Sequence, residues 1–128
     1  LQEARRARHV AAHVIALQRL RKMGIKVGLV TNSIRRTSEF MLTYAGLREL
    51  LDTMITNEDV LEQKPAPEGY LKAMTLLDVS PEETLIIEDG EYGVAAAKAS
   101  GANVIRVGNP DEVCIDLFET LIPKITQL

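Results

Sequence analysis

A short apolar run that ends in two acids is the feature that most constrains this chain. Residues 84–87 have the composition of a buried strand, and Glu88, Asp89 and Gly90 follow them directly. Parallel strands of an open α/β sheet carry their functional groups at their carboxyl ends. Adjacent carboxylates there are costly unless donors or a cation offset their charge, and a hard cation such as Mg²⁺ is the usual partner. The segment therefore indicates a parallel α/β sheet with a candidate metal site at its edge.

Amphipathic and apolar segments alternate along the rest of the chain at short intervals. Helices are expected over residues 2–22, 35–45, 68–77, 94–100 and 116–126, and strands over residues 25–30, 54–56, 85–88 and 104–107. The glycines expected to close helices are Gly24, Gly46 and Gly101. The alternation predicts the α/β class, with a parallel sheet that has helices on both faces. We see no linker or internal repeat, so a single domain over residues 1–128 is expected.

Composition narrows the classes of partner. The chain has 128 residues, enough for one substantial core, and its 46% hydrophobic and 26% charged residues are ordinary for a globular domain. A net charge of −3 and an aromatic content of 4% without Trp argue against a nucleic-acid partner. No apolar run is long enough to span a membrane. The single cysteine, Cys114, excludes an internal disulfide, fits a reducing and therefore cytoplasmic compartment, and is expected in the core or an interface.

A hydroxyl-rich segment, Thr31-Asn32-Ser33, follows one expected strand and precedes an expected helix. Side-chain hydroxyls and backbone N–H groups at a helix start can cradle a phosphate. Taken alone, the same residue types favour plain capping of the helix. Arg35 and Arg36 follow in the first turn and could help to attract an anion, although such arginines more often belong to a solvated surface.

Lys64 opens a stiff segment, Lys-Pro-Ala-Pro, in which the prolines hold the backbone extended and predict a loop. An ammonium group held in place can neutralise a phosphoryl group and a nearby carboxylate. Taken alone, an exposed loop lysine is the simpler interpretation of Lys64. For the acid pair Glu88 and Asp89, metal binding is favoured over a chance surface arrangement.

Taken together and in this order, the segments resemble the haloacid dehalogenase (HAD) superfamily. The segment 28–33 is similar to the second motif of the family, 64–68 to its third and 86–89 to its fourth. The nearest branch is the group of phosphoglucomutases and sugar-phosphate phosphatases, and the resemblance covers residues 9–108. It implies a HAD-like Rossmannoid core, here without its first strand and without a cap domain.

The resemblance also implies an activity and roles for named residues. The activity is Mg²⁺-dependent hydrolysis or transfer of a phosphate monoester, with a small phosphorylated metabolite as substrate. Thr31 and Lys64 would be catalytic: Thr31 would hydrogen-bond the transferring phosphoryl group, and Lys64 would stabilise charge on the nucleophile and the phosphoryl oxygens. Asn32 and Ser33 would complete the phosphate-binding segment. The acid pair Glu88–Asp89 would hold Mg²⁺.

The first motif of the family is absent from the printed sequence. That motif is a strand ending in Asp-x-Asp-Gly-Thr, whose first Asp is the nucleophile and whose second is the general acid/base. No two aspartates here are separated by one residue, and Asp89-Gly90-Glu91 fits the fourth motif better, although Gly90 stands where the family usually has Ser. The absent strand is the central one of the family, between the strands that end at Thr31 and Glu88. Its loss would leave a gap or force those two strands together.

Three explanations of the absent motif stay open. Because the first residue is Leu1 and not Met, the segment could belong to the natural protein upstream. The strand could instead come from another chain, by association or swapping, or the protein could be a reduced relative that no longer catalyses. The sequence thus predicts a truncated or split HAD-like phosphohydrolase that is inactive as this chain alone. The alternative is a non-catalytic, oligomeric binding or scaffold protein, with a homodimer or a complementing chain as its partner.

Charged side chains near the N-terminus have simpler interpretations. His9 and His13 lie four residues apart on an expected helix, which is the spacing of a metal pair. No third ligand is obvious, so surface or interface histidines are favoured. The basic run Arg5, Arg6 and Arg8 is interpreted as a solvated helix end in preference to a nucleic-acid patch.

Overall fold

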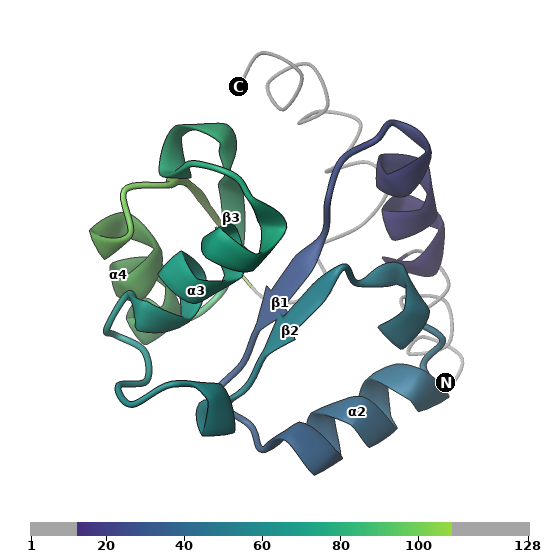
Figure 1. Ribbon diagram of the computed structural model, residues 1–128, viewed down its shortest axis with the longest axis horizontal. Coiled ribbons are helices and arrows are strands. Elements are labelled where there is room, and N and C mark those ends of the chain that lie inside the picture. The colour runs from purple at the N-terminus through teal and green to yellow at the C-terminus, as the bar shows by residue number, and fades with distance from the viewer. Residues whose placement is uncertain (1–12, 109–128) are drawn as a thin grey trace.

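Helices and strands alternate along the chain, as Figure 1 shows for a computed structural model that describes residues 13–108. Residues 13–22 are helical. The elements that follow are β1 (Gly28–Val30), α2 (Arg35–Tyr44), β2 (Thr53–Ile55), α3 (Glu68–Leu77), β3 (Leu85–Glu88), α4 (Glu91–Ala99) and β4 (Asn103–Arg106). Single 3₁₀ turns, η1 (Arg48–Leu50), η2 (Asn57–Asp59) and η3 (Pro81–Glu83), lie between them. The order confirms the α/β class that the sequence predicts.

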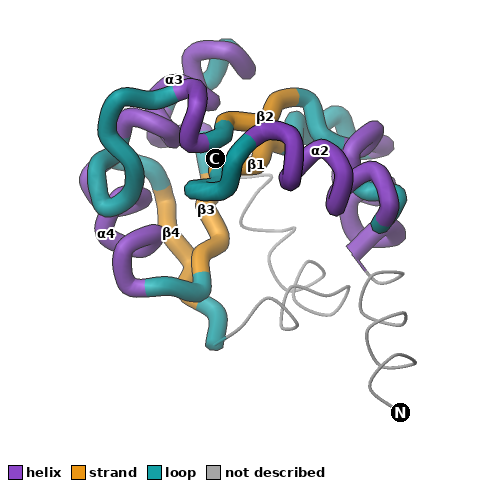
Figure 2. The backbone as a smooth tube through the Cα atoms, turned by 90° about the horizontal axis from the view of Figure 1, so that it is seen from below, coloured by secondary structure: helices purple, strands orange, loops and turns teal. Residues whose placement is uncertain are grey.

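The described strands form two separate parallel pairs. β1 pairs with β2, with Val30 opposite Ile55, and β3 pairs with β4, with Glu88 opposite Arg106. No strand of residues 13–108 joins one pair to the other, and Figure 2 shows the pairs as distinct segments of the backbone. The sequence left open whether a missing central strand would leave a gap or bring β1 and β3 together. Within the described part of the chain, the structure has the gap.

Apolar side chains pack on both faces of β3. Ile86 belongs to a buried cluster with α3 and α4, whereas Ile87 packs against Ala16 and Leu20 of the helix 13–22. Successive side chains of a strand point to opposite faces of its sheet, so the two clusters lie on opposite sides of β3. The buried members of the first cluster are Tyr70, Met74, Ile86, Ala96 and Ala97. This packing agrees with the predicted arrangement of helices on both faces.

Helix α3 connects the two strand pairs. It packs on β1 and β2, and its side chains Tyr70 and Met74 reach Ile86 of β3. A Cβ atom at Gly69 would lie 2.7 Å from Cγ1 of Val30, so the glycine permits the close approach of α3 to β1. The helix has the bounds predicted from the sequence, and it sets the spacing between the strand pairs on either side of the gap.

Strand β1 is shorter than the predicted strand 25–30, because Val27 bonds to a side chain. The Val27 N–H donates to Oδ2 of Asp52 at 2.8 Å, and regular pairing with β2 begins only at Gly28. This backbone hydrogen bond lowers the pKa of Asp52 below its ordinary value; burial opposes the shift and Arg21, at 2.9 Å, adds to it. The side chain of Asp52 thus ends the ladder that composition alone would extend.

Helix α2 is not capped by the hydroxyl-rich segment before it, so the predicted capping is wrong. Its N-cap position is Ile34, which makes no side-chain cap bond. Thr31 Oγ1 accepts from the N–H of Ser33 at 3.1 Å, within the same turn. The first helical N–H, that of Arg35, donates instead to Oε1 of Glu58 in η2 at 3.1 Å. A carboxylate that arrives from another element satisfies the helix start, and local sequence patterns carry no sign of it.

The remaining element bounds differ by small amounts. α4 starts before the predicted residue 94, because Gly90 takes the N-cap position and Glu91 adds an acid to the first turn. β2 and β4 are each displaced by one residue toward the N-terminus from the predicted 54–56 and 104–107. The predicted closing glycines Gly24, Gly46 and Gly101 all have positive φ, at 79°, 74° and 83°.

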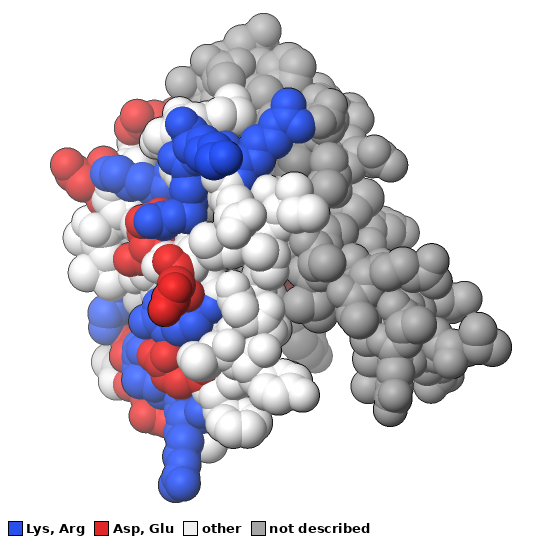
Figure 3. Space-filling model, turned by 90° about the vertical axis from the view of Figure 1, so that its right-hand side faces the viewer, with Lys and Arg blue, Asp and Glu red and all other residues white. Residues whose placement is uncertain are grey.

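Several sequence predictions lie outside residues 13–108: the helix 116–126, the first part of the helix 2–22, Cys114, His9 and the run of arginines. His13 lies in the described part of that helix. None of the described helices is both long and apolar enough to cross a bilayer. On the face shown in Figure 3, acidic and basic side chains lie on the left-hand part of the described surface, beside a band without charged side chains.

Candidate functional site

The three motifs of the sequence meet at the carboxyl ends of β1 and β3. Thr31 follows β1 directly, Asp89 follows β3, and the loop that begins at Lys64 reaches both strand ends. Because Lys64 bonds to Val30 at the end of β1 and to Glu88 at the end of β3, the ends that carry these groups lie close together. The structure therefore brings together segments that are separated in the sequence.

Lys64 joins the two strand ends across the gap. Its Nζ donates to the carbonyl oxygen of Val30 at 3.0 Å and to Oε1 of Glu88 at 2.6 Å. The side chain of Lys64 is 12% exposed and that of Glu88 is 14% exposed, so both charges are largely removed from water. The interpretation of Lys64 as an exposed loop lysine is therefore wrong. Its ammonium is fixed between one strand of each pair.

Glu88 is held from three sides. Besides Lys64, the hydroxyl of Tyr70 donates to the same oxygen, Oε1, at 2.7 Å. The other side of the carboxylate lies against the first turn of α4, where a Cβ atom at Gly93 would be only 1.7 Å from Oε2. Lys64, Tyr70 and Gly93 thus leave the Glu88 carboxylate little freedom to rotate.

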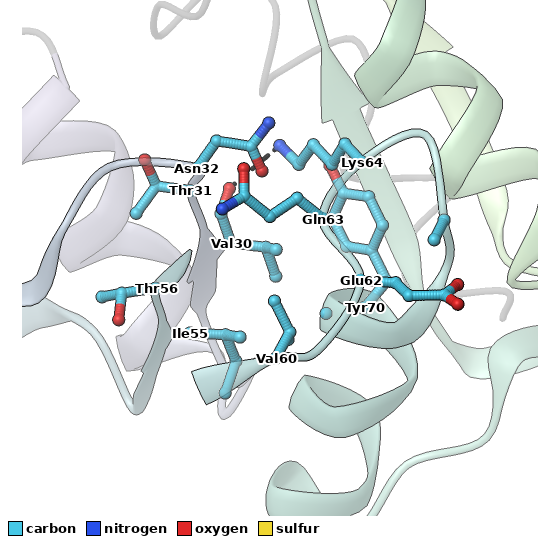
Figure 4. A pocket seen from close by; sticks show the side chains of 12 residues that line it. Val30, Thr31, Asn32, Ile55, Thr56, Val60, Glu62, Gln63, Lys64 and Tyr70 are labelled. Carbon is cyan, nitrogen blue, oxygen red and sulfur yellow. Dashed lines mark hydrogen bonds between the residues drawn. The ribbon is translucent and has the colours of Figure 1, made fainter. Parts of the chain in front are cut away.

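A small pocket lies between the end of β1 and the loop of Lys64. Figure 4 shows Thr31 and Asn32 on one wall, and Gln63, Lys64 and Tyr70 on the other. Its volume is about 10 Å³, which is space for roughly one water molecule and too small for a phosphate group in this conformation. Of the predicted phosphate-binding residues the pocket gathers Thr31, Asn32 and Lys64, whereas Ser33 is not among the lining residues.

Burial and charge act together on the Tyr70 hydroxyl. Tyr70 is only 7% exposed, and burial is the main cause that raises the pKa of its hydroxyl above the ordinary value. The hydrogen bond to Glu88 and the charges of Glu88 and Asp89 raise the pKa further. The hydroxyl therefore keeps its proton and acts as a hydrogen-bond donor to Glu88.

Arg35 is occupied beside the pocket and is not a free anion-binding group. Its guanidinium donates to the carbonyl oxygen of Met54 at 3.1 Å and forms an ion pair with Asp59. Asp59 also accepts from the N–H and the hydroxyl of Thr56, at 2.8 and 2.9 Å. Thr56 is fully buried. This network of Arg35, Asp59 and Thr56 ties the start of α2 to the end of β2.

The acid pair Glu88 and Asp89 fits a Mg²⁺ site in kind but does not complete one. Mg²⁺ in proteins often takes one or two carboxylates and keeps several waters, so two adjacent acids are a reasonable donor set. Among residues 13–108, no three His, Cys, Asp or Glu side chains come together as a metal site. Oε1 of Glu88 already accepts from Lys64 and Tyr70. The described part of the chain thus offers two adjacent carboxylates to a cation, one of which shares its Oε1 with Lys64 and Tyr70.

One residue that sequence reasoning missed, Tyr70, shapes this site together with Gly93. Tyr70 lies in the stripe Tyr70, Ala73, Met74 and Leu77 of α3, whose spacing marks one helix face. A buried tyrosine usually needs a hydrogen-bond partner for its hydroxyl, and that rule was the available signal. At Gly93, only the packed structure shows that the Glu88 carboxylate takes the space where a Cβ would lie.

The fold and this site define a Rossmann-like α/β protein that collects hydroxyl, ammonium and carboxylate groups at the ends of parallel strands. A family model described as haloacid dehalogenase-like hydrolase matches residues 5–107. The chain belongs to this family, as the sequence motifs predict.

Relatives in the family are phosphatases by name. The chain is 32% identical over 124 residues to "Pyrophosphatase PpaX" of Bacillus mycoides (strain KBAB4), a match that covers 88% of this chain and 57% of that protein. It is 41% identical over 85 residues to "Validoxylamine A 7'-phosphate phosphatase" of Streptomyces hygroscopicus subsp. limoneus, covering 66% of this chain and 40% of that protein. The chain thus spans about half the length of these curated relatives.

Two solved structures share the fold of this chain. A putative beta-phosphoglucomutase from Thermotoga maritima superimposes with a TM-score of 0.77 at 24% identity, covering 89% of this chain and 59% of that one. CbbY from Rhodobacter sphaeroides, in complex with phosphate, superimposes with a TM-score of 0.71 at 28% identity, covering 75% and 44%. These likenesses confirm a HAD-like core, of which the chain again covers only part.

Proposed function

We propose that this chain forms part of a phosphatase or phosphomutase core that hydrolyses or transfers phosphate monoesters. The observation that carries the proposal is the junction at Lys64, whose ammonium bonds to the end of β1 and to Glu88 of β3. Phosphoryl transfer depends mainly on positioning and on neutralising charge, which is what a fixed ammonium beside hydroxyl and amide groups provides. The names of the relatives, which are phosphatases, support the same class.

Within this proposal, each strand end has a role. Thr31, with Asn32 and Ser33, would bind the phosphoryl oxygens through hydroxyl and N–H groups at the start of α2. Lys64 would balance the charge of the phosphoryl group and of the attacking carboxylate, and it would have to share or release Glu88 to do so. A small phosphorylated metabolite is the proposed substrate, and the pocket must widen to admit it.

Glu88 and Asp89 are the proposed ligands of Mg²⁺. When bound, Mg²⁺ would neutralise charge on the transferring phosphoryl group. Glu88 is held by Lys64 and Tyr70 with Oε2 on the side of Gly93, so the orientation that these neighbours impose decides which oxygen can reach a cation.

We further propose that the nucleophile belongs to a strand that enters the gap between β1 and β3. Alternate residues of a strand direct their backbone N–H and C=O groups to opposite sides in the plane of the sheet. Thr31 N donates to Ile55 of β2, so the backbone groups of Val30 face away from β2 and toward the gap, where the Val30 carbonyl accepts from Lys64. An entering strand would pair with these groups and bring an aspartate to Lys64. Its source, upstream sequence or a second chain, stays open.

The test is to add the sequence encoded upstream of the Leu1 codon and to measure phosphate release. The probes are p-nitrophenyl phosphate and inorganic pyrophosphate, each with Mg²⁺. We expect activity in the extended chain, and a loss of about 10²- to 10³-fold in kcat/KM for its Lys64→Met variant. Lys98→Met, which replaces an exposed lysine of α4, is the matched control and should keep the parent rate. An extended chain that is folded but inactive, or an upstream sequence without an Asp-x-Asp pair, would contradict the proposal for this source of the strand.

A non-catalytic, oligomeric protein is the second candidate, favoured by the lack of an Asp-x-Asp pair in the printed sequence. In that case the edges of β1 and β3 that lack a strand partner within residues 13–108 would be covered by association with another copy. Sedimentation velocity of the printed chain tests this candidate, because a non-catalytic oligomer predicts a stable assembly at micromolar concentration. A monomer that stays folded would contradict the assembly.

A further inference from the structure

We propose that Tyr70 is a positioning residue of this site: its hydroxyl sets the orientation of Glu88, and its ring and Glu88 together set the place of the Lys64 ammonium. The inference rests on the proposed function for its meaning in catalysis. Its structural part stands on contacts of Tyr70 with both members of the ion pair.

The first step is the placement of Tyr70 itself. It lies near the start of α3, 7% exposed, in the cluster that joins α3 to Ile86 of β3. Gly69 allows the helix to approach Val30 closely at this point. A side chain held by a close helix–strand contact and by a packed cluster has little rotational freedom. The hydroxyl of Tyr70 is therefore presented to Glu88 from a rigid part of the fold.

The second step is that the tyrosine and the lysine both donate a hydrogen bond to the same oxygen atom of Glu88. Tyr70 OH and Lys64 Nζ both donate to Oε1 of Glu88, at 2.7 and 2.6 Å. A carboxylate that receives two donors on one oxygen is fixed in rotation, and its second oxygen is left for other partners. Here Oε2 is directed toward the first turn of α4, beside Gly93.

The third step concerns Lys64. Its Nζ lies 5.1 Å from the centre of the Tyr70 ring, within the range of a cation–π interaction. The ammonium is thus held by the Val30 carbonyl, by Glu88 and by the face of the ring. Without the tyrosine hydroxyl, Lys64 would be the remaining described donor on Oε1 of Glu88, and the carboxylate could follow the flexible lysine chain.

The test removes only the hydroxyl, with Tyr70→Phe. The first readout needs no activity: it is the ¹³C NMR resonance of the Glu88 carboxyl carbon in glutamate-labelled protein, assigned by its disappearance in Glu88→Gln. We expect this resonance to move in Tyr70→Phe. Tyr44→Phe, which removes the same group from a side chain that is 88% exposed, is the matched control and should leave it in place. An unmoved Glu88 resonance in a folded Tyr70→Phe variant would overturn the inference.

A second measurement leaves Tyr70 unchanged, in case Tyr70→Phe does not fold. The chain contains three tyrosines, which can all be replaced by 3-fluorotyrosine and resolved by ¹⁹F NMR. We expect Glu88→Gln to move the Tyr70 signal and to leave the signals of Tyr44 and Tyr92 unchanged. A Tyr70 signal that stays in place in Glu88→Gln would count against the hydrogen bond between the two side chains and therefore against the inference.

The role of Tyr70 in catalysis is tested in the extended chain, which carries the sequence encoded upstream of Leu1. Loss of an outer contact that orients a ligand or a catalytic group typically costs 10- to 100-fold in activity, and we expect that loss in kcat for Tyr70→Phe with a much smaller change in KM. Parent-like kcat with a moved Glu88 resonance would refute the role in catalysis. If the parent extended chain is inactive, the proposed function fails, while the two NMR experiments still decide whether Tyr70 orients Glu88.

Discussion

Glu88 and Gly93 show how one side chain can depend on the absence of another. The carboxylate of Glu88 occupies the space where any other residue at position 93 would place its Cβ, and the three atoms nearest to that position all belong to Glu88. Glycine in a helix interior normally costs about 0.5–1 kcal/mol relative to alanine. Because residue 93 is a glycine, the Glu88 carboxylate has the space it needs to reach Lys64 and Tyr70.

The effect of Gly93→Ala on the free energy of unfolding should therefore have opposite signs in the parent chain and in a Glu88→Ala variant. In the parent chain the new methyl group displaces the Glu88 carboxylate from its donors, so we expect the free energy of unfolding to fall by about 1–2 kcal/mol, the scale of hydrogen bonds to a charged group. In a Glu88→Ala background the same substitution should raise it by about 0.5–1 kcal/mol through helix propensity. Urea unfolding followed by circular dichroism measures both changes. The same sign in both backgrounds would show that Gly93 does not act through Glu88.

At the scale of elements, the carboxylate of Asp59 links the start of α2 to the end of β2. It receives the N–H and hydroxyl of Thr56 and the guanidinium of Arg35. The backbone hydrogen bond from Thr56 is the main cause that lowers the pKa of Asp59 below its ordinary value of 3.8; burial opposes the shift, and the Thr56 hydroxyl and Arg35 add to it. Because the pKa is lower in the folded state, this contribution to stability is complete above the unfolded-state pKa and is lost as pH falls through the folded-state pKa.

In the Asp59→Asn variant, the free energy of unfolding should consequently fall less steeply than in the parent as the pH is lowered. At neutral pH we expect it to lower the free energy of unfolding by about 1–2 kcal/mol, because the ion pair with Arg35 is lost and the bonds from Thr56 become neutral. Below about pH 4 the difference from the parent should shrink, since Asp59 is then protonated in the unfolded parent and, at lower pH, in the folded parent too. Urea unfolding at a series of pH values from about 2.5 to about 7 measures how the free energy of unfolding depends on pH.

Asp78→Asn is the matched control for that experiment. Asp78 lies outside the network and has a left-handed backbone conformation with φ of 56°, which asparagine also adopts readily. A difference between Asp59→Asn and the parent that stays constant across the whole pH range would contradict the assigned role of Asp59.

At the scale of the whole molecule, the main feature is the gap between the strand pairs β1–β2 and β3–β4. Within residues 13–108, α3 and the side chain of Lys64 connect the pairs, and no backbone ladder does. A strand edge without a partner exposes donors and acceptors that invite pairing with another segment. The edges of β1 and β3 that have no strand partner within residues 13–108 are therefore where the proposed strand would pair.

Hydrogen exchange can show whether these edges are paired. In the printed chain we expect the N–H groups of Val30 and Ile87, which face the gap, to exchange faster than those of Thr31 and Val107, which donate to neighbouring strands. In the extended chain, pairing with the new strand should slow the exchange of Val30 and Ile87 by at least about tenfold. Equal protection of all four groups in the printed chain would mean that these edges are already paired.

The sequence alone determined the class of the fold, most element positions and the family. Those results depend on local properties: apolar periodicity, glycine at helix ends, and short motifs at strand ends. They held for α3 and β3, whose predicted bounds agree with the structure, and they held less well where a distant side chain intervened, as Asp52 does at β1 and Glu58 does at α2.

Only the tertiary structure decided which groups of the site contact each other. The bonds from Lys64 to Val30 and Glu88, the hydroxyl of Tyr70 on the same carboxylate, and the space at Gly93 all join residues far apart in the chain. Such contacts depend on how α3 and α4 dock on the strands, because docking sets distances to within a few tenths of an ångström and sequence spacing does not. The motifs therefore indicated the chemistry of the site, whereas packing determined its geometry.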